Sequence, residues 1–224
     1  MRKPFSGALN PLLSAPADRM EHVTTTTNDY LSRMVVDGTN RAEWLAARRR
    51  GVTATEVSKI TDRSTMLEAA SKKIHGDPFR GNKWTQHGID REPVIAAWVL
   101  ENFGIESSSA LFHADGETRH LATPDGVSVI DGTLMLAEIK TTKNGWDVIP
   151  DNYMRQVQWQ QYVLGAERTL FVWEKHEDFV PISDTPEFIW IERDEAMIEH
   201  LVNVANHLIA EIIRRQTAGA QAAS

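Results

Sequence analysis

Two short motifs place acidic and basic side chains where they could act together on a phosphate ester. The run Thr123-Pro-Asp125-Gly carries an aspartate, and Glu138-Ile-Lys140 follows after twelve intervening residues, at the end of an apolar stretch. Carboxylate oxygens are hard donors that suit Mg²⁺ or Mn²⁺. A lysine two residues after Glu138 projects to the same face of a strand, where it could hold an attacking water or neutralise a phosphate. This spacing indicates metal-dependent phosphodiester hydrolysis.

The same two motifs also have an interpretation without chemistry. Pro-Asp-Gly is a common β-turn sequence, and Glu-x-Lys suits an exposed strand with alternating charge. The apolar run 134–137 before Glu138 favours a buried strand instead. Buried carboxylate and ammonium groups are costly without partners or a function. Both interpretations stay open at this point.

The composition is that of an ordinary globular protein. The chain has 224 residues, of which 42% are apolar and 25% charged, enough for one substantial α/β domain and short for two. It has no cysteine, which excludes disulfides, thiolate zinc sites and iron–sulfur clusters. No apolar run approaches the length of a membrane span, and the N-terminus lacks a signal-peptide core. We therefore expect a soluble, cytoplasmic protein with no membrane partner.

The charge of the chain argues against nucleic acid as a partner until its distribution is considered. The net charge is −7, whereas nucleic-acid-binding domains usually carry a basic excess. However, Arg48-Arg49-Arg50 form a compact basic cluster, and Lys72-Lys73 add to it. The arginine run equally suits a solvated helix end, where the macrodipole favours cations. Part of the acidic excess belongs to the candidate metal ligands, whose charge bound cations would offset.

Hydrophobic periodicity and capping residues divide the chain into helices, then short strands, then a mixture of the two. We expect helices at 40–51, 53–60, 64–74, 90–103, 152–164 and 198–212, with Pro93 in the first turn of the fourth. We expect strands at 111–113, 121–123, 127–130, 134–140, 168–173 and 188–192. This order predicts an α/β fold with a mixed central β-sheet flanked by helices. Adjacent strands of that sheet would place Asp125 and Glu138 side by side at one edge.

The same patterns divide the chain into three segments. Residues 1–38 lack sustained periodicity and are predicted to form a partly irregular N-terminal arm. Residues 39–217 are predicted to form a single domain. Residues 218–224, rich in Ala and Gly, are predicted to form a flexible tail.

Four blocks of sequence, in order, resemble the phage lambda exonuclease family, whose members are also described as YqaJ-type viral recombinases of the PD-(D/E)xK nuclease superfamily. The blocks are 44–48 with 51–55, 88–93, 123–126 with 138–140, and 153–158. The resemblance covers roughly residues 40–200 and implies a restriction-endonuclease-like core. It also turns the aspartate and Glu-x-Lys motifs into the expected centre of a nuclease site.

The resemblance implies a role for each residue of that centre. Asp125, Glu138 and the carbonyl of Ile139 would bind Mg²⁺ or Mn²⁺. Glu92, on the helix of the second block, would complete the metal site. Lys140 would position or activate the attacking water.

Three further residues are assigned by the resemblance alone. Gln156 would orient the catalytic lysine or the substrate. Arg48 and Thr55 would contact the 5′-terminal phosphate of DNA. The family usually has serine where Thr55 stands, which is a mild departure because the hydroxyl group is retained.

The resemblance implies a metal-dependent double-strand DNA exonuclease that digests one strand 5′ to 3′. It would release 5′-phosphomononucleotides and leave 3′ single-stranded tails for phage-type homologous recombination. It further implies a ring-shaped homotrimer, a single-strand annealing protein as partner, and the cytoplasm of a phage-infected or prophage-carrying bacterial cell. In a ring, an acidic chain can still bind double-stranded DNA ends, because the basic residues need only line the channel.

Two other functions stay open from the sequence. The first is a site- or structure-specific DNA endonuclease of the same fold. The second is a catalytically silent DNA-binding module. The presence of both carboxylates and the lysine argues against the second.

Overall fold

The strands are divided between two sheets. In this computed structural model, which describes residues 29–77, 79 and 81–222, the first sheet has the order β1-β3-β4-β2. Its strands are β1 (Met34–Val36), β2 (Val52–Thr53), β3 (Leu111–Ala114) and β4 (Glu117–Ala122). The second sheet contains β5 (Gly126–Ile130), β6 (Thr133–Thr142), β7 (Arg168–Glu177), β8 (Val180–Pro181) and β9 (Glu187–Glu192). The predicted α/β fold with mixed strand directions and flanking helices is confirmed.

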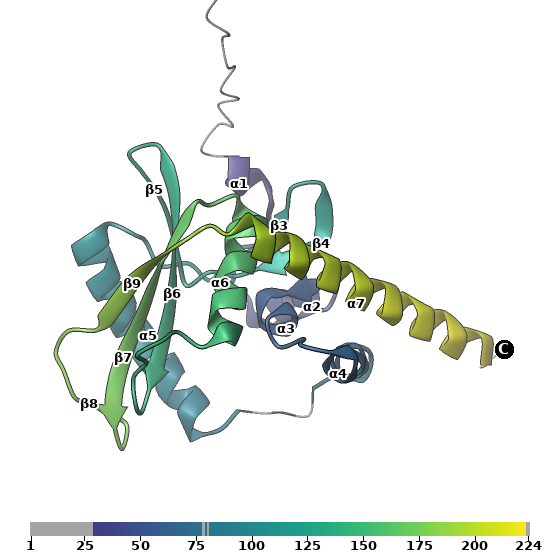
Figure 1. Cartoon of the computed structure of the whole chain (residues 1–224), viewed down its shortest axis with the longest axis horizontal. Helices are drawn as coiled ribbons and strands as arrows, with labels where there is room; N and C mark the ends of the chain where they lie inside the picture. The colour runs from purple at the N-terminus through teal and green to yellow at the C-terminus, as the bar shows by residue number, and fades with distance from the viewer. Residues whose placement is uncertain (1–28, 78, 80, 223–224) are drawn as a thin grey trace, which may run out of the picture.

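The second sheet is built around a parallel pair of strands. Strand β5 runs antiparallel to β6, β6 runs parallel to β7, and β9 runs antiparallel to β7. A parallel pair needs a crossover connection, and helix α6 (Asp151–Leu164) supplies it. Figure 1 shows α6 between this sheet and the helices on the other side of the molecule. The crossover therefore carries α6 directly over the strands that follow Asp125.

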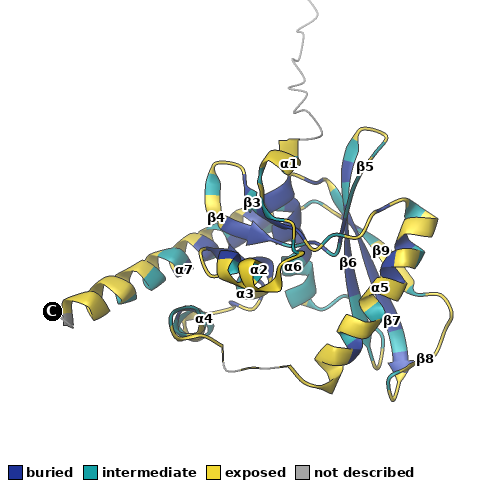
Figure 2. Cartoon of the chain, turned by 180° about the vertical axis from the view of Figure 1, so that it is seen from behind, coloured by how far each residue is buried: buried dark blue, intermediate teal, exposed yellow. Residues whose placement is uncertain are grey.

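Apolar side chains fix which face of β6 each residue occupies. On one face, α5 (Lys83–Phe103) packs Ile95 and Val99 against Ile139 of β6 and Leu170 and Val172 of β7. Leu136, which is two residues before Glu138, packs instead in the cluster that contains Trp159 of α6. Because side chains alternate along a strand, Glu138 lies on the α6 side of the sheet. Figure 2 shows α5 across the opposite face with its outer surface exposed.

Helix α5 begins earlier than predicted. Its N-cap is Asn82, whose side chain accepts hydrogen bonds from the backbone N–H groups of Trp84 and Thr85. The predictions that this helix starts at Asp90 and that Pro93 lies in its first turn are wrong, because Pro93 lies inside the helix. Proline lacks the N–H that would bond the carbonyl of Ile89. Ile89 and Pro93 are both exposed, so the proline lies on the solvent-facing side of the helix.

The remaining helices surround the first sheet and α6. They are α1 (Asp29–Ser32), α2 (Arg41–Arg48), α3 (Ala54–Val57), α4 (Arg63–His75) and α7 (Glu195–Ala222). Helix α7 packs on α4 and α6, and its distal part extends past the body of the molecule to the C-terminus (Figure 1). None of the helices in the described part of the chain is long and apolar enough to cross a bilayer.

The ends of the chain differ in part from the predicted segments. Residues 1–28 of the predicted N-terminal arm lie outside the described residues. The described part of the arm, 29–38, contains α1 and β1, and β1 pairs with β3. At the other end, α7 continues to Ala222, into the segment predicted as a tail.

Candidate active site

Asp125 is held against strand β6 by its own carboxylate. It precedes β5, and its backbone N–H donates to the carbonyl of Ala137 at 3.1 Å. Its Oδ2 accepts a hydrogen bond from the backbone N–H of Ile139 at 2.7 Å. Gly126 permits this approach, because a Cβ there would lie 3.0 Å from the Cβ of Ala137. The Asp125 carboxylate therefore accepts a hydrogen bond from the neighbouring strand and not from a local β-turn.

The same contact orients the backbone of Ile139. In a strand, the N–H and the C=O of one residue point to the same edge. Since the Ile139 N–H points to Asp125, its carbonyl also points to that edge. The carbonyl predicted to assist metal binding thus lies on the side of Asp125.

Glu138 is the most deeply buried acidic group of the site, with 1% exposure. Its Oε1 accepts hydrogen bonds from Lys140 Nζ and Gln156 Nε2. Its Oε2 accepts a hydrogen bond from Gln160 Nε2 at 2.6 Å. The predicted placement of Lys140 on the same face as Glu138 is seen directly in their ion pair.

The charges of the site are unbalanced toward the negative. Burial and the neighbouring Glu138 charge raise the pKa of Asp125 well above its usual range, against the opposing effect of Lys140. Partial burial and Glu138 also raise the pKa of Glu92, again opposed by Lys140. Burial alone would lower the pKa of Lys140, but Glu138 and Asp125 together raise it above its ordinary value. Three carboxylates thus share one protonated lysine.

This donor set has the chemistry of a divalent-cation site. The described residues contain no group of three His, Cys, Asp or Glu side chains already arranged to hold a metal ion. However, Asp125, Glu138 and Glu92 offer hard oxygen atoms, and their mutual repulsion is the kind that a bound Mg²⁺ or Mn²⁺ relieves. Glu92 has an exposed surface, but enough of the protein surrounds its carboxyl group to raise its pKa. The residues present fit such an ion chemically.

Helix α6 supplies two glutamines to the site, one of which the sequence prediction missed. Gln156 was predicted, and it contacts Glu138. Gln160 is fully buried and contacts the other oxygen of Glu138, yet it was not predicted. The four-residue spacing of the two glutamines, which places both on one helix face, was a usable signal.

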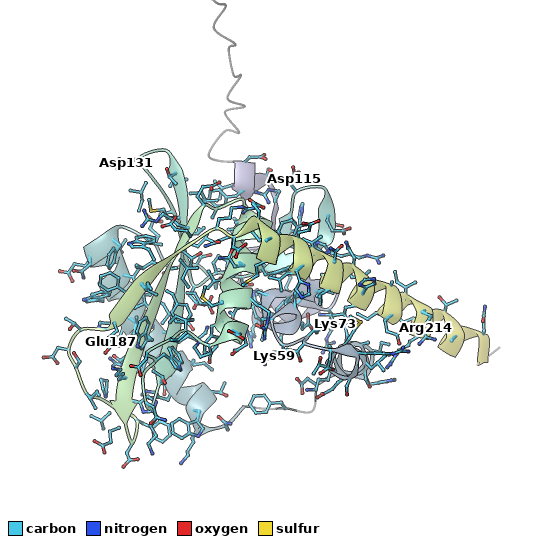
Figure 3. The ribbon with its side chains drawn as sticks, viewed as in Figure 1. Lys59, Lys73, Asp115, Asp131, Glu187 and Arg214 are labelled. Carbon is cyan, nitrogen blue, oxygen red and sulfur yellow. The ribbon has the colours of Figure 1, made fainter. Side chains whose placement is uncertain are left out.

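A basic groove lies beside this site. It has a volume of about 1080 Å³ and is walled by α2, α3, α4 and the first turns of α5. Its charged lining residues, among those that the structure describes, are the acids Glu56, Glu68 and Asp77 and the bases Arg41, Arg48, Arg49, Lys59, Lys72 and Lys73. The groove is thus positively charged in a chain whose net charge is −7. Figure 3 shows Lys59 and Lys73 on this side of the molecule, with Asp131 and Glu187 on the other.

The groove and the carboxylates are adjacent but distinct. Asp125, Glu138 and Lys140 are not among the lining residues of the groove. Helix α5 connects the two, because Thr85 and Ile89 line the groove and Glu92 lies one turn further along. A ligand in the groove would therefore lie about one helix turn from Glu92.

The two predicted phosphate contacts line the same groove. Arg48 is the last residue of α2, as the helix-end interpretation of the arginine run predicted. Its side chain is half-buried, and its guanidinium lies 4.3 Å from the ring centre of Trp44. Thr55 is exposed on α3. Burial lowers the pKa of Arg48, against the opposing effect of Glu56. Arg48 and Thr55 thus line the same groove from separate helices.

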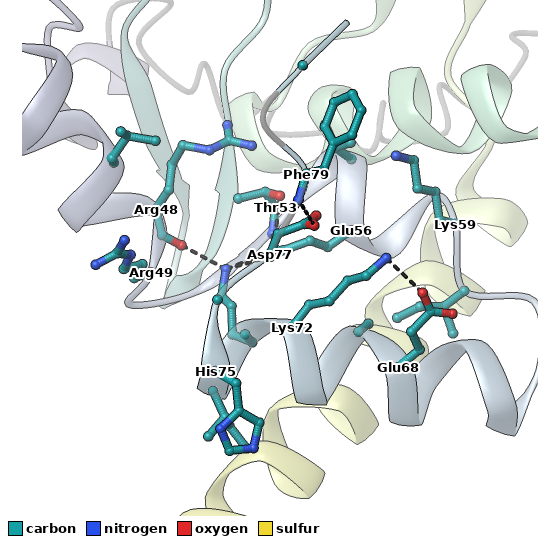
Figure 4. A pocket seen from close by; sticks show the side chains of 18 of the residues that line it. Arg48, Arg49, Thr53, Glu56, Lys59, Glu68, Lys72, His75, Asp77 and Phe79 are labelled. Carbon is teal, nitrogen blue, oxygen red and sulfur yellow. Dashed lines mark hydrogen bonds and ion pairs between the residues drawn. The ribbon is translucent and has the colours of Figure 1, made fainter.

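Figure 4 shows Arg48, Thr53 and Glu56 in this part of the groove. Lys73 ties their helices to one another. Its Nζ donates to the main-chain carbonyl of Arg48 at 2.9 Å and to both carboxylate oxygens of Glu56 at 2.7 and 2.9 Å. Glu56 in turn accepts the backbone N–H of Thr53 at 2.8 Å. Burial lowers the pKa of Lys73, against the opposing effect of Glu56. One ammonium group thus links α4 to the ends of α2 and α3.

Several solved structures that are similar to this chain are described as exonucleases. The alkaline exonuclease LHK-Exo from Laribacter hongkongensis is 27% identical, with a TM-score of 0.66 over 81% of this chain and 98% of that one. A second structure of LHK-Exo, in complex with dAMP, matches with a TM-score of 0.65 at the same identity and coverage. A phage-related exonuclease from Haemophilus somnus matches at 16% identity, with a TM-score of 0.50 over 85% of this chain and 95% of that one, and supports the fold alone.

Among curated proteins, the polyketide synthase GfsA from Streptomyces halstedii is 30% identical over 121 residues. Those residues are 52% of this chain, which spans only 2% of the length of that protein. The sequence model of a protein family, described as the YqaJ-like viral recombinase domain, matches residues 43–167. That match covers more than half of the chain and contains the aspartate, the Glu-x-Lys motif and both glutamines. The protein therefore belongs to the YqaJ-like viral recombinase family.

Proposed function

We propose that this protein is a metal-dependent exonuclease that acts on the ends of double-stranded DNA. The observation that carries the proposal is the cluster of Asp125, Glu138 and Lys140 on adjoining strands, beside a basic groove. The likeness to LHK-Exo, which is described as an alkaline exonuclease, supports the same activity.

In this proposal, each residue of the cluster has a defined task. Asp125, Glu138 and the Ile139 carbonyl hold Mg²⁺ or Mn²⁺, and Glu92 completes the site. A bound divalent ion supplies a water of lowered pKa and offsets the charge of the phosphate. Lys140, kept protonated by Glu138 and Asp125, donates hydrogen bonds to the attacking water or to the scissile phosphate.

The resemblance implies that Gln156 orients the lysine or the substrate, and its contacts support the first of these two tasks. Its amide donates to Glu138 Oε1, the oxygen that also accepts Lys140 Nζ. We therefore propose that Gln156 orients Lys140 indirectly, through their shared carboxylate oxygen.

The groove binds the DNA end in this proposal. Its lysines and arginines contact the backbone phosphates, and Arg48 and Thr55 hold the 5′-terminal phosphate. Holding the 5′ end sets the direction of digestion as 5′ to 3′, releases 5′-phosphomononucleotides and leaves a 3′ single-stranded tail. The dAMP complex of LHK-Exo supports a mononucleotide as the product.

The proposal extends to assembly and partners through the family resemblance. A homotrimeric ring would bring three basic grooves around one DNA duplex while the acidic surface faces outward. A single-strand annealing protein would take up the 3′ tail for phage-type recombination in the cytoplasm of a bacterial host. Light scattering of the purified protein tests the trimer directly.

One experiment separates the exonuclease from its alternatives. Linear 5′-phosphorylated duplex and closed circular duplex are incubated with the protein and Mg²⁺, with labels at both ends of the linear substrate. We expect loss of the 5′ label as mononucleotide and an intact circle. Cutting of the circle would indicate an endonuclease, and no release from either substrate would indicate a silent DNA-binding module.

A further inference from the structure

Gln160 is the hydrogen-bond donor to the second oxygen of Glu138. It lies on α6, one turn beyond Gln156, and is fully buried. Its Nε2 lies 2.6 Å from Glu138 Oε2 and 3.4 Å from the carbonyl oxygen of Thr123. Both neighbours are hydrogen-bond acceptors, so only the NH₂ end of the amide can face them. The contact thus joins Glu138 to the segment that leads into Asp125.

The two oxygens of Glu138 differ in how many protein donors they have. A carboxylate oxygen can accept about two hydrogen bonds or metal contacts. Oε1 already accepts both Lys140 and Gln156. Oε2 accepts Gln160 as its only donor among the described residues. Oε2 is therefore the oxygen with capacity left for a cation, and Gln160 is the group that fixes it.

We propose that Gln160 is a positioning residue that aims Glu138 Oε2 for divalent-metal binding. The inference rests on the proposed function, in which Glu138 is a metal ligand. Removing the Gln160 donor would let the carboxylate rotate about its Lys140 and Gln156 contacts and lose the orientation that its Oε2 now has. Groups that orient a metal ligand in this way typically change metal affinity or activity about 10- to 100-fold when they are removed.

The adjacent residue, Gln161, provides a matched control. It is equally buried, and its Nε2 donates to Thr169 Oγ1 at 3.0 Å and to the carbonyl of Ile191 at 2.9 Å. In both glutamines the side-chain carbonyl oxygen is buried without a partner among the described residues. The two side chains thus have the same burial and the same kind of hydrogen bonding, but only Gln160 contacts Glu138.

The test compares Gln160→Met with Gln161→Met, since methionine has nearly the same volume and no donor. Binding of Mn²⁺ to the full-length, DNA-free protein is measured by calorimetry, and the melting temperature by circular dichroism. We expect both variants to shift the melting temperature by similar amounts. We expect Gln160→Met to bind Mn²⁺ about 10- to 100-fold more weakly and Gln161→Met to stay within about twofold of the wild type.

Steady-state kinetics on linear duplex provide a second measurement. Because the groove is unchanged, Gln160→Met should lower kcat and leave the KM for DNA within about twofold. If Gln160→Met does not fold, Gln160→Asn serves instead, because its amide is one methylene too short to reach Glu138 and the same loss is expected. Wild-type hydrolysis with equal Mn²⁺ affinity in the Gln160 and Gln161 variants would overturn this inference alone. Absence of metal-dependent hydrolysis in the wild type would overturn the proposed function and the inference with it.

Discussion

The carboxylate cluster and the basic groove hold their charges by different means. In the cluster, the register of β5 and β6 and a main-chain N–H fix Asp125 and Glu138 in a buried setting. In the groove, most cations are carried by separate helices, and Lys73 joins those helices through ion pairing. Like charges are therefore packed together in the cluster, at a cost in stability. The groove instead spreads its charge over a solvated surface.

Substitution of Asp125 should separate activity from stability most sharply. Asp125→Asn removes a proposed metal ligand, and we expect hydrolysis of linear duplex to fall at least ~10³-fold. The variant should nevertheless be more stable than the wild type, with a free energy of unfolding about 1–2 kcal/mol larger near neutral pH. The reason is that the charged form of Asp125 is disfavoured in the folded protein. Chemical denaturation and nuclease assays measure the two effects.

The pH dependence of the Asp125 effect has a definite sign. Since the folded-state pKa of Asp125 is raised, the wild type loses stability as pH rises through that pKa. The stability advantage of Asp125→Asn should therefore shrink as pH falls toward the ordinary carboxyl pKa. An advantage that is constant with pH would contradict the assignment of strain to the Asp125 charge.

Substitution of Lys140 should reduce activity and stability together. Lys140→Met removes the cation that the carboxylates share, so we expect a loss of about 10²–10³-fold in hydrolysis and of about 3 kcal/mol in unfolding free energy. The opposite stability effects of Lys140→Met and Asp125→Asn are the signature of a cluster with excess negative charge. Loss of stability in both variants would show that packing, and not charge, governs this region.

Substitution of Arg48 should affect binding and not chemistry. Arg48→Ala removes the proposed contact to the 5′-phosphate. We expect kcat/KM on phosphorylated ends to fall about 10- to 100-fold. The same variant should act on 5′-hydroxyl ends nearly as well as the wild type. Arg50→Ala is the control, because Arg50 is exposed and does not line the groove. Equal losses on both kinds of end would refute the phosphate contact.

Substitution of Lys73 tests whether the groove depends on its buried ion pair. Lys73→Met leaves Glu56 without its cation, and we expect a loss of about 2 kcal/mol in stability and a rise of about five- to tenfold in KM, with kcat retained. Lys72→Met is the control, because Lys72 pairs with Glu68 in an exposed setting. We expect that variant to leave the stability nearly unchanged, because an exposed ion pair contributes little. Similar KM values for the two variants would indicate that only the total charge of the groove matters.

Local periodicity allowed the acidic part of the site to be predicted. The apolar run before Glu138 indicated a buried strand, and the two-residue period placed Lys140 on the face of Glu138. The prediction that adjacent strands of the sheet hold Asp125 and Glu138 at one edge placed Asp125 beside these two residues. The structure contains all three of these relations.

The features of the structure that were not predicted depend on contacts between distant segments, which short-range sequence patterns do not determine. Lys72 and Lys73 look alike in sequence, and only the packing of α4 against α3 decides which one meets Glu56. The start of α5 was missed because Pro93 was taken to mark a first turn, whereas Pro93 lies inside the helix at an exposed position. The role of Gln160 depends on the crossover that lays α6 over β6.

Helix α6 joins the candidate active site and the second sheet into one cooperative unit. It is the crossover between the parallel strands β6 and β7, and it also carries the two amides that hold Glu138. Local unfolding of α6 that released the two glutamine side chains from Glu138 would also expose the core residues Val157 and Trp159. Amide hydrogens of α6 and β6 should therefore exchange only through near-global unfolding, and the two segments should be protected equally.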